Sequence, residues 1–485
     1  MKRFMSNKAN AIYSTAIALI FALAVYNLFY NLGNFQIANY DEARHGVSAY
    51  EMLQNGNYIV NTYRYLPDYW NLKPPLSFWS VILGYKIVGY NALGLRLIAA
   101  VFGLLTIMMV AFFMLKKHGK LASAISALVL TTTFQYLTNH GVRTGNPDSL
   151  YVFFFTASVL ALLLSGKNNK WIYISGLAFS LAFLTKSWHA FSIVGIIGIY
   201  LILSNKFRSF RFKQWILLIS CMFLPIMIWG IIRYQYDGAT FFKDMVAYDL
   251  LRRSSNTIEG HVGGKLFYLR IFFQFYILWF SILFGAVLVY LNKNISFKQY
   301  QLLTPDKKAY LIGICAWVII PILIFSVAKT KIRWYIMPVY PAFSVIIGVL
   351  ASRVIRDGKR AMKIFLIGAI LMASGAYELN IYRYVHHDYP DPEQTLIQQL
   401  TGKYEMKGRS LFDYKRKKEW PQKIVLTAEL AADLHIDDGN FNAFLRSDRG
   451  LLLVQKQFYS KKFLDTHHLR VVAFNKWGYI VGKVQ

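Results

Sequence analysis

Charged residues, and acidic ones above all, are scarce in this chain of 485 residues. Only 16% of the residues are charged, 56% are hydrophobic, and Asp and Glu together number 24 against 54 Lys and Arg. Soluble globular proteins usually contain about 25% charged residues, so this balance argues against a water-soluble fold for most of the chain. The sequence therefore favours an integral membrane protein.

Cysteine is also nearly absent. Cys221 and Cys315 both lie within apolar segments, which disfavours a disulfide framework and a Cys-based metal site. The sequence has no P-loop, dinucleotide-binding glycine motif or internal repeat, so we do not expect an ATP-driven transporter. The net charge of +30 does not indicate nucleic acid, because Lys and Arg concentrate in short loops between apolar runs, as in cytoplasmic loops of membrane proteins.

Long apolar runs are what the chain has in abundance. We expect about eleven membrane-spanning helices, since many runs approach the roughly 20 residues needed to cross hydrocarbon. The predicted spans cover residues 12–30, 93–115, 121–137, 150–164, 171–184, 190–203, 215–232, 266–291, 310–327, 335–350 and 364–377. Residues 76–88 could form a further span or an interfacial helix, and we favour the interface. The first run lacks a small-residue cleavage site, so we expect it to be retained.

The distribution of basic loops predicts a cytoplasmic N-terminus. The predicted cytoplasmic loops are 116–120, 166–170, 206–213, 293–308 and 353–363. The outer face then receives residues 31–76, 140–148, 186–189, 233–265, 329–334 and everything after about 382. Loop 329–334 is basic against this rule; phosphate binding would explain the exception, and so would a miscounted span.

Composition changes to polar and mixed charge after residue 382. We expect residues 383–485 to form a small α/β domain outside the cytoplasm, with a helix near 427–434 and strands at 451–454, 469–474 and 479–481. Residues 1–382 would form the transmembrane domain, in which 31–92 is the first periplasmic loop with interfacial helices.

Two adjacent carboxylates, Asp41 and Glu42, follow the first predicted span. Ionisable groups close to hydrocarbon are often functional, although Asp41 could equally be a helix cap. Further along come the segments YEMLQNGNYIV at 50–60 and NLKPPLSFW at 71–79. In order and spacing, these features resemble the bacterial aminoarabinose transferases acting on lipid A. More broadly, they resemble the GT-C glycosyltransferases, which include the protein O-mannosyltransferases.

The resemblance continues through Asp148, Leu184-Thr185-Lys186 and KIRWYIMPVYP at 331–341, and covers about the first 350 residues. It implies a polytopic α-helical, GT-C-like fold in the bacterial inner membrane. It also implies a donor sugar carried on polyprenyl phosphate such as undecaprenyl phosphate. The acceptor would be lipid A, another envelope lipid or glycan, or a protein; we expect membrane lipids and no nucleic acid as further partners.

The resemblance also assigns roles to individual residues. Asp41 matches the family's first-loop Asp and is the expected base for the acceptor hydroxyl in an inverting single displacement. Glu42 and Asp148 are further candidate catalytic carboxylates. The candidate phosphate-binding residues are Lys73, Tyr335, Arg252, Arg253, Lys331 and Arg333. Two prolines fix the backbone after Lys73, but basic residues near span ends also extend to lipid headgroups, which is the structural alternative for each of them.

A metal site is left open by the sequence. His261, in the glycine-rich segment 259–264, is a candidate contact to substrate or metal, together with Arg44 and Lys186. In the aminoarabinose transferases the residue before the Lys-Pro-Pro lysine is usually a Glu implicated with the loop His in metal binding, but Leu72 stands here. A divalent ion would need other oxygen ligands, for which Glu42 or Asp148 are candidates.

Two other functions fit a chain with many spans and charges near the membrane. A flippase or secondary transporter of lipid-linked saccharides would favour repeated halves and broken midplane helices, which the sequence does not show. The second alternative is a catalytically silent relative that only binds polyprenyl phosphate. The presence of Asp41, Lys73 and Tyr335 argues against it, and Leu72 in place of the family's Glu argues for it.

Overall fold

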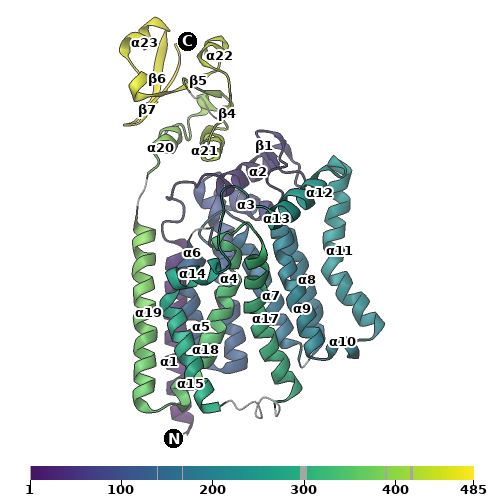
Figure 1. Ribbon diagram of the computed structural model, residues 1–485. Coiled ribbons are helices and arrows are strands. Elements are labelled where there is room, and N and C mark those ends of the chain that lie inside the picture. The colour runs from purple at the N-terminus through teal and green to yellow at the C-terminus, as the bar shows by residue number, and fades with distance from the viewer. Residues whose placement is uncertain are drawn as a thin grey trace. The chain divides into compact units, whose positions relative to one another are not determined.

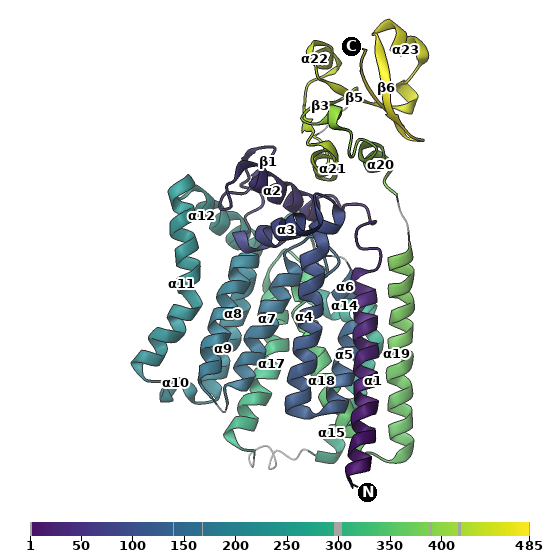
Figure 2. The ribbon, with the colours of Figure 1, turned by 180° about the vertical axis from the view of Figure 1, so that it is seen from behind.

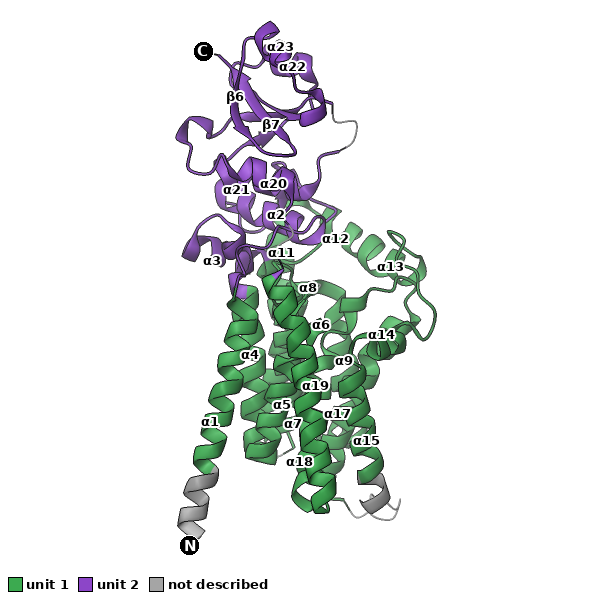
Figure 3. Ribbon diagram, turned by 90° about the vertical axis from the view of Figure 1, so that its left-hand side faces the viewer, with its two compact units in different colours: residues 1–30, 72–77, 99–386 green, residues 31–71, 78–98, 387–485 purple. Residues whose placement is uncertain are grey.

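The computed structural model describes residues 2–138, 140–166, 168–294, 303–387, 390–415 and 419–484. The chain forms two compact units, coloured separately in Figure 3. Unit 1 comprises Met1–Tyr30, Leu72–Ser77 and Ala99–His386, and unit 2 comprises Asn31–Asn71, Phe78–Ile98 and His387–Gln485. The last segment of unit 2 begins close to the predicted boundary after 382, but unit 2 also includes most of the predicted first outer loop.

Unit 1 is a set of helices that run alongside one another, seen from opposite sides in Figures 1 and 2. The long helices are α1 (Lys2–Phe29), α4 (Ala92–His118, whose first turns belong to unit 2), α5 (Lys120–Thr131), α7 (Asp148–Leu164), α8 (Lys170–Lys186), α9 (Phe191–Leu203), α11 (Phe212–Asp237), α15 (Ile277–Asn294), α17 (Pro305–Val327), α18 (Val339–Asp357) and α19 (Arg360–His386). Shorter elements connect them: α6 (Phe134–Leu137), η1 (Ser187–Ala190), α10 (Lys206–Ser209), α12 (Thr240–Asp244), η2 (Met245–Arg252), α13 (Arg253–Ser255), α14 (Phe267–Phe275) and η3 (Arg333–Ile336).

Every predicted span falls on one of these helices or on a consecutive pair. By length and apolarity, seven helices in the described part of the chain can cross a membrane, or eight if α14 and α15, bent by 100°, count as one span. Helices α5 and α7 are shorter, and α8 to α9 pass as one segment of 34 residues, so the count of eleven is not confirmed. Residue 167 and residues 295–302, in two predicted cytoplasmic loops, lie outside the described residues.

Two buried polar side chains inside unit 1 bond to other chain segments, which offsets the cost of placing them in apolar surroundings. The Arg143 guanidinium donates to the carbonyls of Asn27 at 2.7 Å and Tyr30 at 2.8 Å, where α1 ends and its last carbonyls have no partner within the helix. The Asn27 side chain donates to Glu378 of α19 at 2.8 Å. These bonds fix the end of α1 against its neighbours.

Unit 2 contains the first loop and the C-terminal segment. Its elements are α2 (Asp41–Asn55), β1 (Thr62–Tyr63), β2 (Leu66–Pro67), most of α3 (Pro75–Val88), α20 (Pro392–Gln398), η4 (Tyr404–Met406), β3 (Ser410–Asp413), α21 (Gln422–Ala432), β4 (His435–Ile436), α22 (Phe441–Arg446), β5 (Leu451–Gln455), η5 (Lys456–Phe458), α23 (Lys461–Thr466), β6 (Leu469–Phe474) and β7 (Gly478–Lys483). One core includes Val47 of α2, Phe78 of α3 and Leu426 of α21. Gly46 lets α2 approach α21, because a Cβ there would lie 2.5 Å from Leu426 Cδ2.

The C-terminal segment has a mixed five-stranded sheet in the order β4-β3-β5-β7-β6. Strands β3 and β4, and β3 and β5, are parallel, while β7 pairs antiparallel with β5 and β6. The three strands expected from the sequence appear as β5, β6 and β7. Strands β3 and β4 were not predicted, because runs of four and two residues carry little alternation to detect.

Candidate functional site

Asp249, in the π-helix η2, is the centre of a buried ionic cluster in unit 1. Its Oδ2 accepts hydrogen bonds from Lys73 Nζ at 3.4 Å and Ser187 Oγ at 3.3 Å, and its Oδ1 accepts one from Arg253 Nε at 2.9 Å. The Asp249 side chain is only 3% exposed, and those of Lys73 and Arg253 are 17% and 18% exposed. We call Lys73, Ser187, Asp249 and Arg253 the Asp249 cluster.

The charge state of this cluster follows from its geometry. Burial alone would raise the pKa of the Asp249 carboxyl, but the Lys73 and Arg253 cations beside it outweigh burial and hold that pKa below its ordinary value. The carboxylate therefore stays ionised at neutral pH between two cations. One positive charge is left over, which suits an anionic ligand.

Lys73 reaches the cluster because of its local sequence. Pro74 and Pro75 follow it, Pro75 is the first residue of α3, and a residue before proline is restricted to extended backbone. The chain at Lys73 thus cannot continue a helix backwards from α3. Its side chain extends instead to Asp249 of η2, far away in the sequence.

A second buried ion pair joins Lys186 at the end of α8 to Asp148 at the start of α7. The Lys186 ammonium lies 5.6 Å from the ring centroid of Tyr335 and 5.9 Å from that of Tyr151. The ring of His189 meets the Tyr335 ring at 4.5 Å in an edge-on arrangement. The structure therefore brings together three predicted site residues from separate segments, namely Asp148, Lys186 and Tyr335.

Backbone hydrogen bonds join the loop around Lys331 to the loop that follows η2. Lys329 N donates to Ser254 O at 3.0 Å, and Lys331 N donates to His261 O at 3.1 Å. This pairing holds the predicted residues of two loops side by side.

The basic side chains in these loops differ in their contacts. Lys331 Nζ donates to the carbonyls of Phe325 at 3.2 Å and Ser326 at 2.5 Å in the last turn of α17, and to that of Ala328 just after the helix. This is a helix-capping role, and it competes with the predicted binding of phosphate by Lys331. Arg252 and Arg333 are exposed, and each lies 5.5 Å from an aromatic ring centroid.

In unit 2, Asp41 is the first residue of α2 and is half-buried. Glu42 beside it is tightly held: its Oε1 accepts from Arg96 Nε at 2.7 Å, and its Oε2 accepts from Arg96 Nη2 at 2.9 Å and from Ala38 N at 2.9 Å. The same guanidinium also donates to the carbonyls of Leu32, Phe35 and Gln36. Glu42 thus fixes the segment that leads into α2.

We predict a large loss of stability from breaking this pair. Glu42 is 1% exposed and Arg96 is 3% exposed, so Arg96→Ala would leave a buried carboxylate without its cation, at a cost of about 3–5 kcal/mol. Arg64→Ala, which removes a pair that is 33% and 65% exposed, is the matched control and should cost no more than about 1 kcal/mol. Hydrogen exchange of α2 in the full chain measures both, and equal protection in the two variants would contradict this role.

Arg44, one turn after Asp41, is held in the same way. Its Nε and Nη2 donate to the two oxygens of Asp68, both at 2.8 Å, and its guanidinium lies 4.1 Å from the Tyr63 ring centroid. Asp68 also accepts from the backbone N–H groups of Trp70 and Asn71. Arg44 therefore fixes the segment that precedes Leu72 and Lys73.

The candidate metal ligands His261 and Glu42 are engaged with other side chains. His261 Nε2 has the carboxylate of Glu259 at 4.0 Å, and both oxygens of Glu42 accept from Arg96. Among the described residues, no three His, Cys, Asp or Glu side chains gather into a set that could hold a metal. The candidate ligands do not fit a protein-bound divalent ion, which takes three or more such donors.

A pair of buried carboxyl groups connects α2 to α21 within unit 2. Burial raises the pKa of Glu429 well above its ordinary value, and the neighbouring Glu51 and Asp433 raise it further. Burial also raises the pKa of Glu51 above its ordinary value. Both raised values mean that the folded state retains protons that the unfolded chain gives up.

The stability of unit 2 should therefore fall as pH rises through the interval that starts near the unfolded carboxyl pKa of about 4.3. Below that pH both states are protonated and the pair has no effect. Glu429→Gln should reduce the pH dependence of the free energy of unfolding. At about pH 8 it should also raise the midpoint of thermal unfolding relative to wild type. Glu405→Gln, an exposed change in the same unit, is the control, and equal pH profiles for both variants would contradict a raised pKa of Glu429.

Asp249, Asp68 and Arg96 are the site residues that the sequence did not reveal. One signal existed for Asp249, because it precedes Arg253 by four residues, the spacing that places two side chains on one helical face. The partners of Asp68 and Arg96 lie 24 and 54 residues away, so no local spacing marks them.

Comparison with known proteins finds relatives for part of this chain. A family model described as dolichyl-phosphate-mannose-protein mannosyltransferase matches residues 72–229. A protein of Aquifex aeolicus is 28% identical over 75% of this chain and 69% of its own length. Undecaprenyl phosphate-alpha-4-amino-4-deoxy-L-arabinose arabinosyl transferase 2 of Pseudomonas fluorescens is 22% identical over 71% of this chain and 62% of its own length.

The fold has a match along nearly the whole chain. The crystal structure of ArnT from Cupriavidus metallidurans bound to undecaprenyl phosphate superposes with a TM-score of 0.69 at 15% identity, covering 97% of this chain and 99% of that one. The chain is thus a multi-pass helical membrane protein with that fold. In sequence and fold together, the chain is similar to the GT-C glycosyltransferases, and it resembles the aminoarabinose transferases and the protein mannosyltransferases among them.

Proposed function

We propose that this protein transfers a sugar from a polyprenyl-phosphate carrier, such as undecaprenyl phosphate, to an acceptor hydroxyl on the outer face of a bacterial inner membrane. The observation that carries the proposal is the Asp249 cluster, a buried group with two cations around one carboxylate. The binding of undecaprenyl phosphate by ArnT, a protein of the same fold, supports it.

The cluster suits a lipid phosphate. Lys73 lies 3.4 Å from Asp249, a long contact that a phosphate oxygen can replace with a shorter charge-assisted bond. Arg253 presents a planar guanidinium, of which Nε is engaged by Asp249. When the sugar leaves, negative charge develops on the bridging phosphate oxygen, and cations already held in place stabilise it without reorganisation.

Lys186 and Tyr335 would complete the phosphate site from the neighbouring ion pair. Asp148 holds Lys186, so its role is to position that lysine rather than to take a proton from the acceptor. Lys331 caps α17 and would act on the loop rather than on the ligand. Arg252 and Arg333, being exposed, would meet lipid headgroups or the more distant part of the donor.

Asp41 is the proposed base. A carboxylate that accepts the proton of the attacking hydroxyl usually contributes about 10² to 10⁴ in rate. Attack on the anomeric carbon in a single displacement inverts its configuration, forms the bond from acceptor oxygen to sugar, and releases polyprenyl phosphate. In this proposal the N-terminus is cytoplasmic, and unit 2 and the acceptor are both on the periplasmic side of the membrane.

The test is transfer itself. Purified protein in lipid nanodiscs is incubated with a panel of polyprenyl-phosphate sugars and an envelope extract, and the products are analysed by mass spectrometry. We expect one donor to yield free polyprenyl phosphate together with an acceptor whose mass has grown by one sugar. Translocation of the intact donor across proteoliposomes, with no acceptor modified, would replace this proposal by a flippase.

A further inference from the structure

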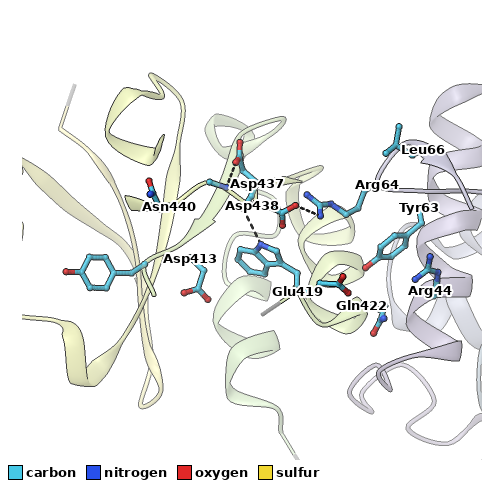
Figure 4. A pocket seen from close by; sticks show the side chains of 13 residues that line it. Arg44, Tyr63, Arg64, Leu66, Asp413, Glu419, Gln422, Asp437, Asp438 and Asn440 are labelled. Carbon is cyan, nitrogen blue, oxygen red and sulfur yellow. Dashed lines mark hydrogen bonds and ion pairs between the residues drawn. The ribbon is translucent and has the colours of Figure 1, made fainter. Parts of the chain in front are cut away.

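Unit 2 contains a half-open polar cavity of about 790 Å³ to which the proposed reaction assigns no role. One side is formed by residues of the first loop: Arg44 of α2, Tyr63 and Arg64 of the β1–β2 hairpin, and Leu66. The other side is formed by residues 413–414, 419–420, 422 and 437–440 of the C-terminal segment. Figure 4 shows Tyr63 and Arg64 pointing toward the C-terminal segment, where Arg64 meets Asp438. Its volume is that of a small-molecule binding site, for which roughly 300–1,000 Å³ is usual.

The lining has the chemistry that binds sugars. It combines aromatic rings (Tyr63, Tyr414, Trp420), side-chain amides (Gln422, Asn440), carboxylates (Asp413, Glu419, Asp437, Asp438) and guanidiniums (Arg44, Arg64). Carboxylates accept hydrogen bonds from sugar hydroxyls, and side-chain amides both donate and accept them. Aromatic ring faces pack against the apolar side of a sugar. Burial raises the pKa of Tyr63 to about 12, so its hydroxyl stays protonated and available as a donor.

The charge of the cavity is opposite to that of the protein. The chain carries +30, whereas four carboxylates line the cavity against two guanidiniums. Both guanidiniums are engaged, since Arg44 is bonded by Asp68 and Arg64 by Asp438 at 2.7 Å. The excess of negative charge repels phosphorylated or carboxylated ligands and favours neutral or amine-bearing ones.

The cavity is also close to the proposed base along α2. Asp41 and Arg44 are three residues apart on this helix, a spacing that puts side chains one turn apart on the same face. A ligand that touches Arg44 would therefore have its end near Asp41. A saccharide fits this lining, because its hydroxyls can bond to the carboxylates and amides while its apolar side lies against the rings.

We propose that this cavity is an acceptor subsite that takes a non-phosphorylated saccharide, neutral or amine-bearing, and presents its hydroxyl to Asp41. This inference rests on the proposed function and deepens it by naming the acceptor's chemical class. It predicts that saccharides bind without any donor present. Glu419 supplies exposed negative charge, and Gln422 supplies hydrogen bonds at the start of α21.

The experiment measures saccharide binding to the full chain in nanodiscs by saturation-transfer NMR, without donor. The probes are chitobiose, a glucosamine disaccharide and the same disaccharide bearing phosphate. We expect wild type to bind the first two at least about tenfold more tightly than the third, which is about 1.4 kcal/mol. Glu419→Lys should weaken binding of the amine-bearing disaccharide and reduce the preference for the unphosphorylated over the phosphorylated disaccharide. The exposed Glu405→Lys, outside the cavity, should change neither affinity.

Gln422→Ala provides a second variant without a change of charge. It should lower the affinity for every saccharide probe about 3- to 10-fold through one lost hydrogen bond. Failure of wild type to bind any probe, preference for the phosphorylated disaccharide, equal behaviour of Glu419→Lys and Glu405→Lys, or binding of a lysine-rich peptide instead would each overturn the inference. Saccharide binding without transfer from any donor would instead contradict the proposed function. The two failures are therefore distinguishable.

Discussion

Asp41→Asn is expected to lower sugar transfer by about 10²- to 10⁴-fold while the protein stays folded, because the amide keeps the shape of the carboxylate but cannot accept a proton. Asp41 is half-buried at the start of α2, and the neighbouring Glu42 is engaged by Arg96, so Glu42 is not expected to replace it. The loss should appear in kcat rather than in the KM for donor. Initial rates of polyprenyl phosphate release at saturating acceptor measure it.

The matched control for this prediction is Asp465→Asn, an exposed carboxylate in α23 of the same unit. It should transfer sugar at the wild-type rate. A fall in kcat shared by both variants would show that the assay reports loss of fold. Wild-type turnover in Asp41→Asn would remove Asp41 as the base.

The second large effect is expected from Lys73→Ala. Loss of one charge-assisted bond to the donor phosphate is worth about 1.5–3 kcal/mol, so the KM for donor should rise about 10- to 100-fold. kcat should fall as well, since the same ammonium stabilises the departing phosphate. Lys73→Arg should recover part of the loss, because charge is kept while the geometry changes.

Lys86→Ala supplies the control for Lys73, because Lys86 is an exposed lysine of α3, the helix that Lys73 precedes. Its KM should equal that of wild type. Direct binding of polyprenyl phosphate, compared with that of polyprenol, separates contact with the phosphate from contact with the lipid chain. If Lys73→Ala binds both lipids as wild type does, the Asp249 cluster is not the phosphate site.

The sequence predicted the helices of unit 1 well because long apolar runs report directly on burial in hydrocarbon. It predicted the number of spans less well, since α5 and α7 are shorter than a full crossing and α14 bends sharply into α15. Grouping by composition also placed the first loop with the transmembrane part. In the structure, Val47 and Phe78 of that region share a core with Leu426, a contact between distant segments that composition cannot reveal.

The candidate site could be predicted where a residue stands in a recognisable segment. Asp41, Lys73, Lys186 and Tyr335 lie in such segments, and the structure places the last three in buried ionic or aromatic surroundings in unit 1. Asp249 escaped prediction because its importance comes from two partners that arrive from elsewhere in the chain. Lys331 looked like a phosphate ligand in the sequence, but its ammonium is bonded to the carbonyls that end α17.

The most direct measurement of the central claim is the stoichiometry of one reaction, in which free polyprenyl phosphate and glycosylated acceptor are counted together by mass spectrometry. We expect one polyprenyl phosphate for each sugar gained by the acceptor, and no release when the acceptor is omitted. Release of polyprenol with phosphate retained on the acceptor, or release that does not depend on acceptor, would contradict it.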